Sequence, residues 1–108
     1  MIYSIDELKR KIAPVAEKYR LSAVYLFGSY ARNEATDNSD VDILIDRTGS
    51  SVKSMFDMGA LYNDLCESIG KEVDLVTTYA LIQDGASDRT PWFTENVMRE
   101  RVAVYGQQ

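Results

Sequence analysis

The stretch FGSYARNEATDNSDVDILI, from Phe27 to Ile45, decides how the rest of this chain is interpreted. Near its end, two acidic residues, Asp40 and Asp42, precede an apolar run. If residues 40–45 form a β-strand, side chains two positions apart lie on the same face, so the two carboxylates project together. The apolar side chains between them then face the other way. Paired carboxylates suit a divalent metal ion, so the stretch predicts a metal site at the start of a strand.

A glycine turn lies at the beginning of the same stretch. Gly28 and Ser29 follow the apolar run Ala23 to Phe27, which predicts a buried strand, and they precede a short helix expected at Tyr30 to Arg32. A glycine turn that leads into a helix N-terminus presents backbone N–H groups to an anion. The turn therefore favours phosphate next to the predicted metal site.

Length and composition limit the kinds of protein that this chain can be. With 108 residues we expect one small domain over 1–108, without room for a separate acceptor-binding domain, so a second substrate would need another chain. The net charge of −5 and the lack of a Lys/Arg cluster argue against nucleic acid as a partner. No run is apolar enough for a membrane span or a signal peptide, so we expect a cytoplasmic protein.

The residue types exclude several chemistries. Cys66 is the only cysteine, which rules out an intrachain disulfide and a zinc site built from thiolates. The sequence has no histidine, and so no His-based triad or imidazole acid–base catalysis. Carboxylates, lysine, tyrosine and hydroxyls are left to carry any chemistry.

The whole chain predicts an α/β (α+β) domain in which helices flank a small mixed β-sheet. We expect strands at Ala23–Phe27, Asp40–Asp46, Glu72–Thr77 and Val102–Tyr105. We expect helices at Ser4–Tyr19, from Val52 to Ile69, at Tyr79–Gln83 and from Pro91 to Arg101, with a loop at Asp84–Thr90. Pro14 predicts a kink in the first helix or its division into two.

Capping residues mark both ends of the helix expected from Val52 to Ile69. Ser50 or Ser51 is the expected N-cap, and Gly70 is the expected residue at its C-terminal end. The apolar period places Met55, Phe56 and Tyr62 on the face toward the core.

A third aspartate, Asp74, lies among apolar neighbours in the strand expected at 72–77. Magnesium takes oxygen ligands, commonly one or two carboxylates plus substrate phosphates, and Asp40, Asp42 and Asp74 supply that donor type. In a two-metal site Asp42 would bridge the ions and Asp74 would bind one, and Asp74 could take the proton of an acceptor hydroxyl. Each aspartate taken alone is better explained as a turn residue or a solvated strand position, but their combination with the glycine turn is specific.

These motifs resemble the nucleotidyltransferase superfamily of DNA polymerase β type, most closely its minimal single-domain (MNT) branch. The resemblance rests on Gly28-Ser29-Tyr30-Ala31-Arg32, Ser39-Asp40-Val41-Asp42 and Val73-Asp74-Leu75-Val76. It implies a nucleotidyltransferase fold, two magnesium ions held by the three aspartates, and a triphosphate held by the glycine-serine turn. The family usually has glycine where this chain has Asn33, and asparagine tolerates the left-handed backbone that such a turn needs.

The candidate nucleotide-binding residues are Gly28, Ser29, Arg32 and Ser39. Arg32 has the alternative of a structural ion pair with a carboxylate, and Ser39 that of orienting the loop before Asp40. We expect Tyr30 to pack in the core rather than line the site. Trp92 and Phe93 either anchor the last helix or form a patch for a partner.

The resemblance also implies a partner. Minimal members are typically encoded beside an all-helical HEPN protein and act as its antitoxin, some by transferring AMP from ATP to a tyrosine of that toxin. We therefore expect a HEPN toxin as partner, in a hetero-oligomer, and ATP with Mg²⁺ as substrate. Two alternatives stay open: an antitoxin that neutralises its partner by binding alone, and a nucleotidyltransferase for a small molecule such as an aminoglycoside.

Overall fold

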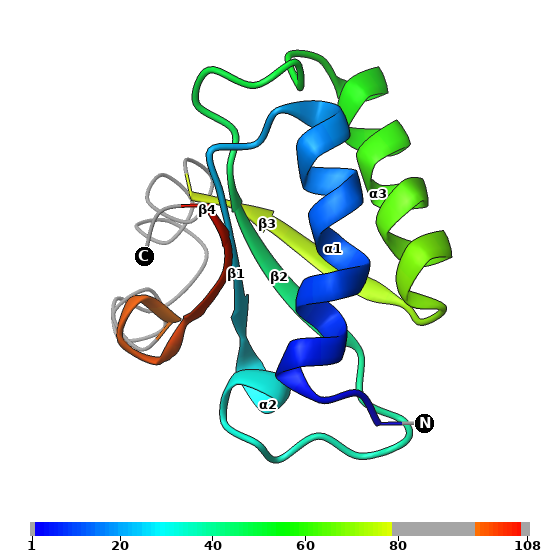
Figure 1. Ribbon diagram of the computed structural model, residues 1–108, viewed down its shortest axis with the longest axis vertical. Helices are drawn as coiled ribbons and strands as arrows, with labels where there is room; N and C mark the ends of the chain where they lie inside the picture. Colours follow the sequence, from blue (N-terminus) through cyan, green and yellow to red (C-terminus); the bar gives the residue numbers. More distant parts are fainter. Residues whose placement is uncertain (1, 79–96, 107–108) are drawn as a thin grey trace.

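The computed structural model describes residues 2–78 and 97–106, which form a mixed sheet with helices packed against it (Figure 1). The elements in chain order are α1 (Ile5–Tyr19), β1 (Ala23–Phe27), α2 (Gly28–Ala31), β2 (Val41–Asp46), α3 (Met55–Ile69), β3 (Val73–Thr77) and β4 (Val102–Gly106). The expectations for a helix at 79–83, a loop at 84–90, the start of the last helix and the roles of Trp92 and Phe93 lie outside the described residues. Residues 97–100 are helical, as expected.

The four strands of the described residues lie in the order β3-β2-β1-β4. β2 and β3 are parallel, whereas β1 is antiparallel to both β2 and β4. The mixed sheet is therefore confirmed, and each strand begins and ends within one residue of its prediction.

The two faces of the sheet carry different layers. Alternate side chains such as Leu26 and Ile43 lie in the main core cluster, which α1 and α3 complete on one face. Leu44 and Phe27 belong to a second, smaller cluster on the opposite face, together with Val97 of the helical residues 97–100. Figure 1 shows α1 and α3 on one side of the sheet and the helical residues 97–100, in orange, on the other. At its middle β2 is buried on both faces, through Ile43 on one and Leu44 on the other, whereas Asp42 and Asp46 lie toward the two ends of the second face.

The helix α1 is a single helix of fifteen residues. Of the two alternatives for Pro14, the division into two short helices was therefore wrong, and the kink stays a prediction. The Ser4 Oγ accepts a hydrogen bond from the Glu7 N–H at 3.1 Å, and the Glu7 carboxylate accepts one from the Ser4 N–H at 2.9 Å, which completes a capping box. Pro14 lies on the exposed side and removes one backbone hydrogen bond. Buried side chains on either side of it, Ile12 and Val15, hold the helix on the sheet across that position.

The helix α3 begins later than predicted. Its N-cap is Ser54, in a capping box with Asp57, and not Ser50 or Ser51. Ser50 is buried and accepts a hydrogen bond from the Val52 N–H at 3.1 Å, and the Ser51 hydroxyl donates to the Tyr19 carbonyl, so both serines order the loop before the helix. Gly70 ends the helix with φ +78°, as expected.

The prediction that Met55 and Phe56 face the core was wrong. Their exposed fractions are 85% and 91%, and the buried face of α3 consists of Leu61, Leu65 and Ile69. Met55 is the first residue of the helix, and Phe56, five residues before Leu61, lies on the side away from the buried face, whereas Met58 of the same turn is partly buried against the main cluster. Tyr62 is partly buried against the main cluster, which confirms its packing role. None of the helices in 2–78 and 97–106 combines the length and the apolar character needed to cross a membrane.

Candidate active site

The sheet brings two of the three predicted aspartates together. Asp42 of β2 and Asp74 of β3 are direct neighbours in the parallel pairing, and Asp42 is also opposite Phe27 of β1. Neighbouring strands lie roughly 4.8 Å apart, and side chains at paired positions share a face. Both carboxylates therefore project from the face of the sheet opposite α1 and α3.

Asp40 precedes the first residue of β2 and is exposed. The Val41 N–H after it donates to the Glu72 carbonyl at 3.0 Å, which begins the parallel pairing. The Asp40 charge raises the pKa of Asp42, so the two carboxylates are within electrostatic reach of each other. All three aspartates thus belong to one acidic end of the sheet.

Gly28 is packed directly against Asp42. It has φ +69°, and a Cβ atom at this position would meet Oδ2 of Asp42 and come within 3.0 Å of its Cγ. A positive φ and a missing side chain are both required here, which only glycine supplies without strain. The glycine turn therefore lies against Asp42, as the sequence motif suggested.

Asp42 is half-buried, and its environment opposes ionisation. Burial, followed by the negative charges of Asp74 and Asp40, raises the pKa of Asp42 to about 6, and the nearby Arg32 opposes this. Like charges so close to a partly desolvated carboxylate favour either a proton or a cation between them.

The donors at this place fit magnesium. They are carboxylate oxygens, and their mutual repulsion would be relieved by a divalent cation. Within 2–78 and 97–106, no three His, Cys, Asp or Glu side chains, the three predicted aspartates included, are grouped so that they could hold a metal ion by themselves. Magnesium is commonly held by one or two protein carboxylates plus substrate phosphates rather than by a full protein cage, so the donor set agrees with this use.

The turn after Gly28 keeps the conformation that its motif requires. Asn33 has φ +60°, which confirms that asparagine takes the left-handed position there. The Ser29 carbonyl accepts a hydrogen bond from the Glu34 N–H at 2.8 Å and fixes the turn. Tyr30 is buried in the main cluster, which confirms its packing role, and Lys71 donates to its hydroxyl at 3.1 Å.

Ser39 orders the loop before the acidic strand. Its hydroxyl oxygen accepts a hydrogen bond from the Thr36 N–H at 2.8 Å, and its own N–H donates to the Thr36 carbonyl at 3.0 Å. This is the orienting role that we considered for Ser39, since the turn it closes leads directly into Asp40. Its part in nucleotide binding stays a prediction.

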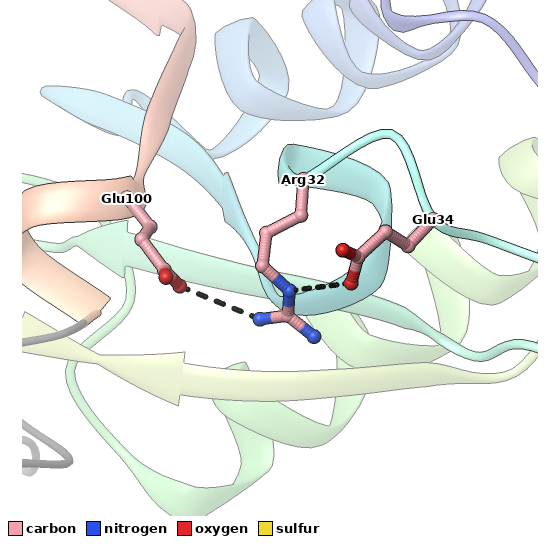
Figure 2. A network of polar contacts seen from close by, with 3 residues as sticks. All are labelled: Arg32, Glu34 and Glu100. Carbon is pink, nitrogen blue, oxygen red and sulfur yellow. Dashed lines mark hydrogen bonds and ion pairs between the residues drawn. The ribbon is translucent and has the colours of Figure 1, made fainter.

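Arg32 makes two ion pairs with carboxylates (Figure 2). Its Nε donates to Glu34 at 2.9 Å, and its Nη1 donates to Glu100 at 3.4 Å. The structural alternative for Arg32 is thus observed, and its contact with phosphate stays a prediction. The partners Glu34 and Glu100 were not predicted from the sequence. No pattern links the glycine turn to a glutamate 68 residues further along the chain.

A cavity of about 270 Å³ lies elsewhere, beside the N-terminus of α1. Its lining consists of Ile2, Tyr3, Ser4, Ile5, Asp6, Tyr30, Asn33 and Ala35. It shares the segment after Gly28 with the acidic site, but none of the three aspartates lines it.

This arrangement defines a class of protein. The mixed sheet places carboxylates on two neighbouring parallel strands, and a glycine turn at the end of the adjacent strand packs against one of them. This is the framework of a nucleotidyltransferase. Comparison with known families agrees with this assignment. Residues 10–107 match the family described as Polymerase beta, Nucleotidyltransferase. The chain belongs to this family and is a nucleotidyltransferase.

A candidate protein adenylyltransferase of Methanocaldococcus jannaschii is 44% identical over 86 residues, which cover 80% of this chain and 89% of that protein. A chain of a toxin–antitoxin complex solved with AMP-PNP is 23% identical, with a TM-score of 0.67, and the match covers 93% of this chain and 74% of that one. A chain from the complex of tri-AMPylated Shewanella oneidensis HEPN toxin with an MNT antitoxin is 20% identical, with a TM-score of 0.60, over 94% of this chain and 71% of that one. At such identities the two structural matches establish a shared fold.

Proposed function

We propose that this chain is a magnesium-dependent adenylyltransferase that acts as an antitoxin, transferring AMP from ATP to a tyrosine hydroxyl of a HEPN toxin. The observation that carries the proposal is the pairing of Asp42 with Asp74 against Gly28, which assembles the acidic pair beside the glycine turn. Support for the nucleotide and for a protein acceptor comes from relatives named as adenylyltransferases and from the AMP-PNP and HEPN complexes that share the fold.

In this proposal Asp40, Asp42 and Asp74 hold two magnesium ions, which would neutralise charge on the triphosphate and on the leaving group. The backbone of Gly28 and Ser29 holds the phosphates, because the glycine turn lets the chain approach an anion closely. Ser39 keeps the loop before Asp40 in place.

The chemical step is a transfer at the α-phosphorus. The tyrosine oxygen forms a bond to this phosphorus while the bond to the β-phosphate oxygen breaks and pyrophosphate leaves. The tyrosine proton passes to Asp74, whose exposed carboxylate is accessible to an acceptor from solvent. The acceptor is supplied by the partner protein in a hetero-oligomeric complex, in the cytoplasm.

The test is a mass measurement. The purified chain is incubated with the HEPN protein encoded beside it, ATP and Mg²⁺, and we expect the mass of the HEPN protein to rise by one or more AMP units. Asp42→Ala should abolish the increase. The matched control is Asp46→Asn, which changes a carboxylate on the same face of β2 at its other end and should leave the transfer intact.

An unchanged mass would overturn the proposal. Two further outcomes identify the alternatives. If Asp40→Ala/Asp42→Ala still protects cells from the toxin as well as the unmodified chain does, neutralisation occurs by binding alone. If AMP is transferred to an aminoglycoside but not to the HEPN protein, the acceptor is a small molecule.

A further inference from the structure

Arg32 lies at the edge of the acidic site, at the C-terminal end of the short helix α2. Its side chain is 43% exposed, and two carboxylates hold it from different parts of the chain. Glu34 is a neighbour in the loop, whereas Glu100 comes from the helical residues before β4. Figure 2 shows the guanidinium between the two carboxylates.

Stability alone explains this arrangement poorly. Ion pairs between exposed side chains contribute little to folding, because solvent screens them and two long side chains lose freedom. Two further carboxylates beside an acidic site would also repel a triphosphate. The ion pairs with Arg32 offset this repulsion because they neutralise part of the negative charge of Glu34 and Glu100.

The segment that carries Glu100 is firmly anchored. Val97 is 5% exposed and packs in the cluster of Phe27 and Leu44, and the Arg101 N–H donates to the Val97 carbonyl at 2.9 Å. The Arg101 guanidinium lies 4.3 Å from the centre of the Tyr25 ring, which secures the end of the segment on the sheet. Glu100 is therefore presented to Arg32 from a fixed backbone.

Arg32 is held next to the site by the short helix α2. This helix begins at Gly28, which is packed against Asp42, it contacts β2, and Arg32 is its C-cap. A guanidinium at that place has the planar donor geometry that matches phosphate oxygens.

We propose that Glu100 is a positioning residue, which together with Glu34 holds the Arg32 guanidinium at the edge of the site where the triphosphate binds. This inference rests on the proposed function, because it requires a nucleotide at the acidic site. The helical residues before β4 thus take part in binding the nucleotide, although Glu100 is 68 residues from Arg32 along the chain.

The experiment is a double-mutant cycle on nucleotide binding, measured by calorimetric titration of the full chain with AMP-PNP and Mg²⁺. We expect Glu100→Ala to weaken the Kd by about 3- to 10-fold and Arg32→Ala by at least as much. In the Arg32→Ala background, Glu100→Ala should cause no further loss. Glu100→Gln, which keeps an acceptor oxygen without the charge, should recover part of the affinity.

The matched control is Glu17→Ala, which removes an exposed glutamate of α1 and should leave the Kd unchanged. Equal effects of Glu100→Ala with and without Arg32, or no effect at all, would overturn the inference while the unmodified chain still binds the nucleotide. If the unmodified chain does not bind AMP-PNP, the proposed function itself fails. The two failures are thus distinguishable.

Discussion

Gly28 shows how one residue without a side chain determines the geometry of the site. Its φ of +69° and its contact with Asp42 leave no space for a Cβ atom, so the glycine turn and the acidic strand approach as closely as the backbone allows. Another glycine, Gly49, has a similar φ of +74° but has no atom within 4 Å of the position a Cβ would take. A substitution at Gly49 therefore tests backbone strain alone, whereas one at Gly28 tests strain together with crowding against Asp42.

Gly28→Ala is expected to lower nucleotide affinity or transfer by about 100-fold, because a shift of about 1 Å at a reacting centre has an effect of that order. Gly49→Ala should show only the cost of a left-handed backbone, about 1–2 kcal/mol of unfolding free energy, with normal nucleotide binding. Thermal unfolding and titration with AMP-PNP measure the two effects. Equal nucleotide binding by both variants would contradict the crowding at Gly28.

Asp42 and Asp46 lie on the same face of β2, and their ionisation changes the stability of the fold with pH in opposite directions. The pKa of Asp42 is raised to about 6, chiefly by burial, so its contribution to stability is complete below its unfolded pKa near 3.8 and is lost as the pH rises through about 6. The pKa of Asp46 is lowered, first by the hydrogen bond from the Thr48 N–H, so its contribution is present above its unfolded pKa and is lost on acidification.

In buffer containing EDTA at pH 8, Asp42→Asn should therefore raise the free energy of unfolding, by about 1–2 kcal/mol after allowance for solvent screening of a half-exposed group. The gain should disappear toward pH 4. Asp46→Asn should instead lower stability at pH 8. Urea unfolding across this pH range measures both, and a stabilising Asp46→Asn together with a destabilising Asp42→Asn at pH 8 would refute the assignment.

At the scale of elements, strands were easier to predict than the start of α3. Each strand is marked by an apolar run bounded by polar residues, and its position in the sheet does not alter that pattern. Phe56 was misplaced because it lies about 140° around the helix from Leu61, although Met58 in the same turn is partly buried. An apolar side chain outside the buried stripe of a helix stays exposed, and the sequence alone does not show which side the core covers.

The contrast within α3 gives a stability prediction. Phe56→Ser should change the free energy of unfolding by about 0.5 kcal/mol or less, because the ring is 91% exposed. Leu61→Ala, five residues further on and fully buried, should cost about 2–5 kcal/mol through lost burial and the remaining cavity. Urea unfolding compares the two variants directly, and a similar loss in both would show that Phe56 is packed.

At the scale of the whole molecule, β4 joins the end of the described chain to the strand that leads into the site. It pairs with β1 along its length, and Val104 is 6% exposed in the main core cluster. Gly106, with φ +82°, ends the pairing where a Cβ would meet the carbonyl oxygen of Ser22. The position of β1 beside Asp42 thus depends partly on residues at the other end of the chain.

A chain that ends at Arg101 should expose the edge of β1, and unpaired strand edges promote association. We expect it to unfold at least about 10 °C lower or to aggregate, since it loses a strand and part of the core. A chain that ends at Gly106 keeps β4 and is the control. Light scattering and thermal unfolding measure the difference, and normal behaviour of the shorter chain would show that β4 is dispensable.

The sequence by itself determined the parts of this protein that depend on local patterns. These are the four strands and the glycine turn with Asn33 in its left-handed position. They were predictable because a run of side chains carries its own period, and because turns require particular residue types.

Only the tertiary structure decided how these parts meet. Strand order and register place Asp42 beside Asp74 and against Gly28, and the packing of residues 97–101 on the sheet brings Glu100 to Arg32. The exposure of Met55 and Phe56 likewise depends on which part of α3 the core covers. Such contacts join residues far apart in the chain, and their formation depends on the packing of the whole core rather than on any local pattern.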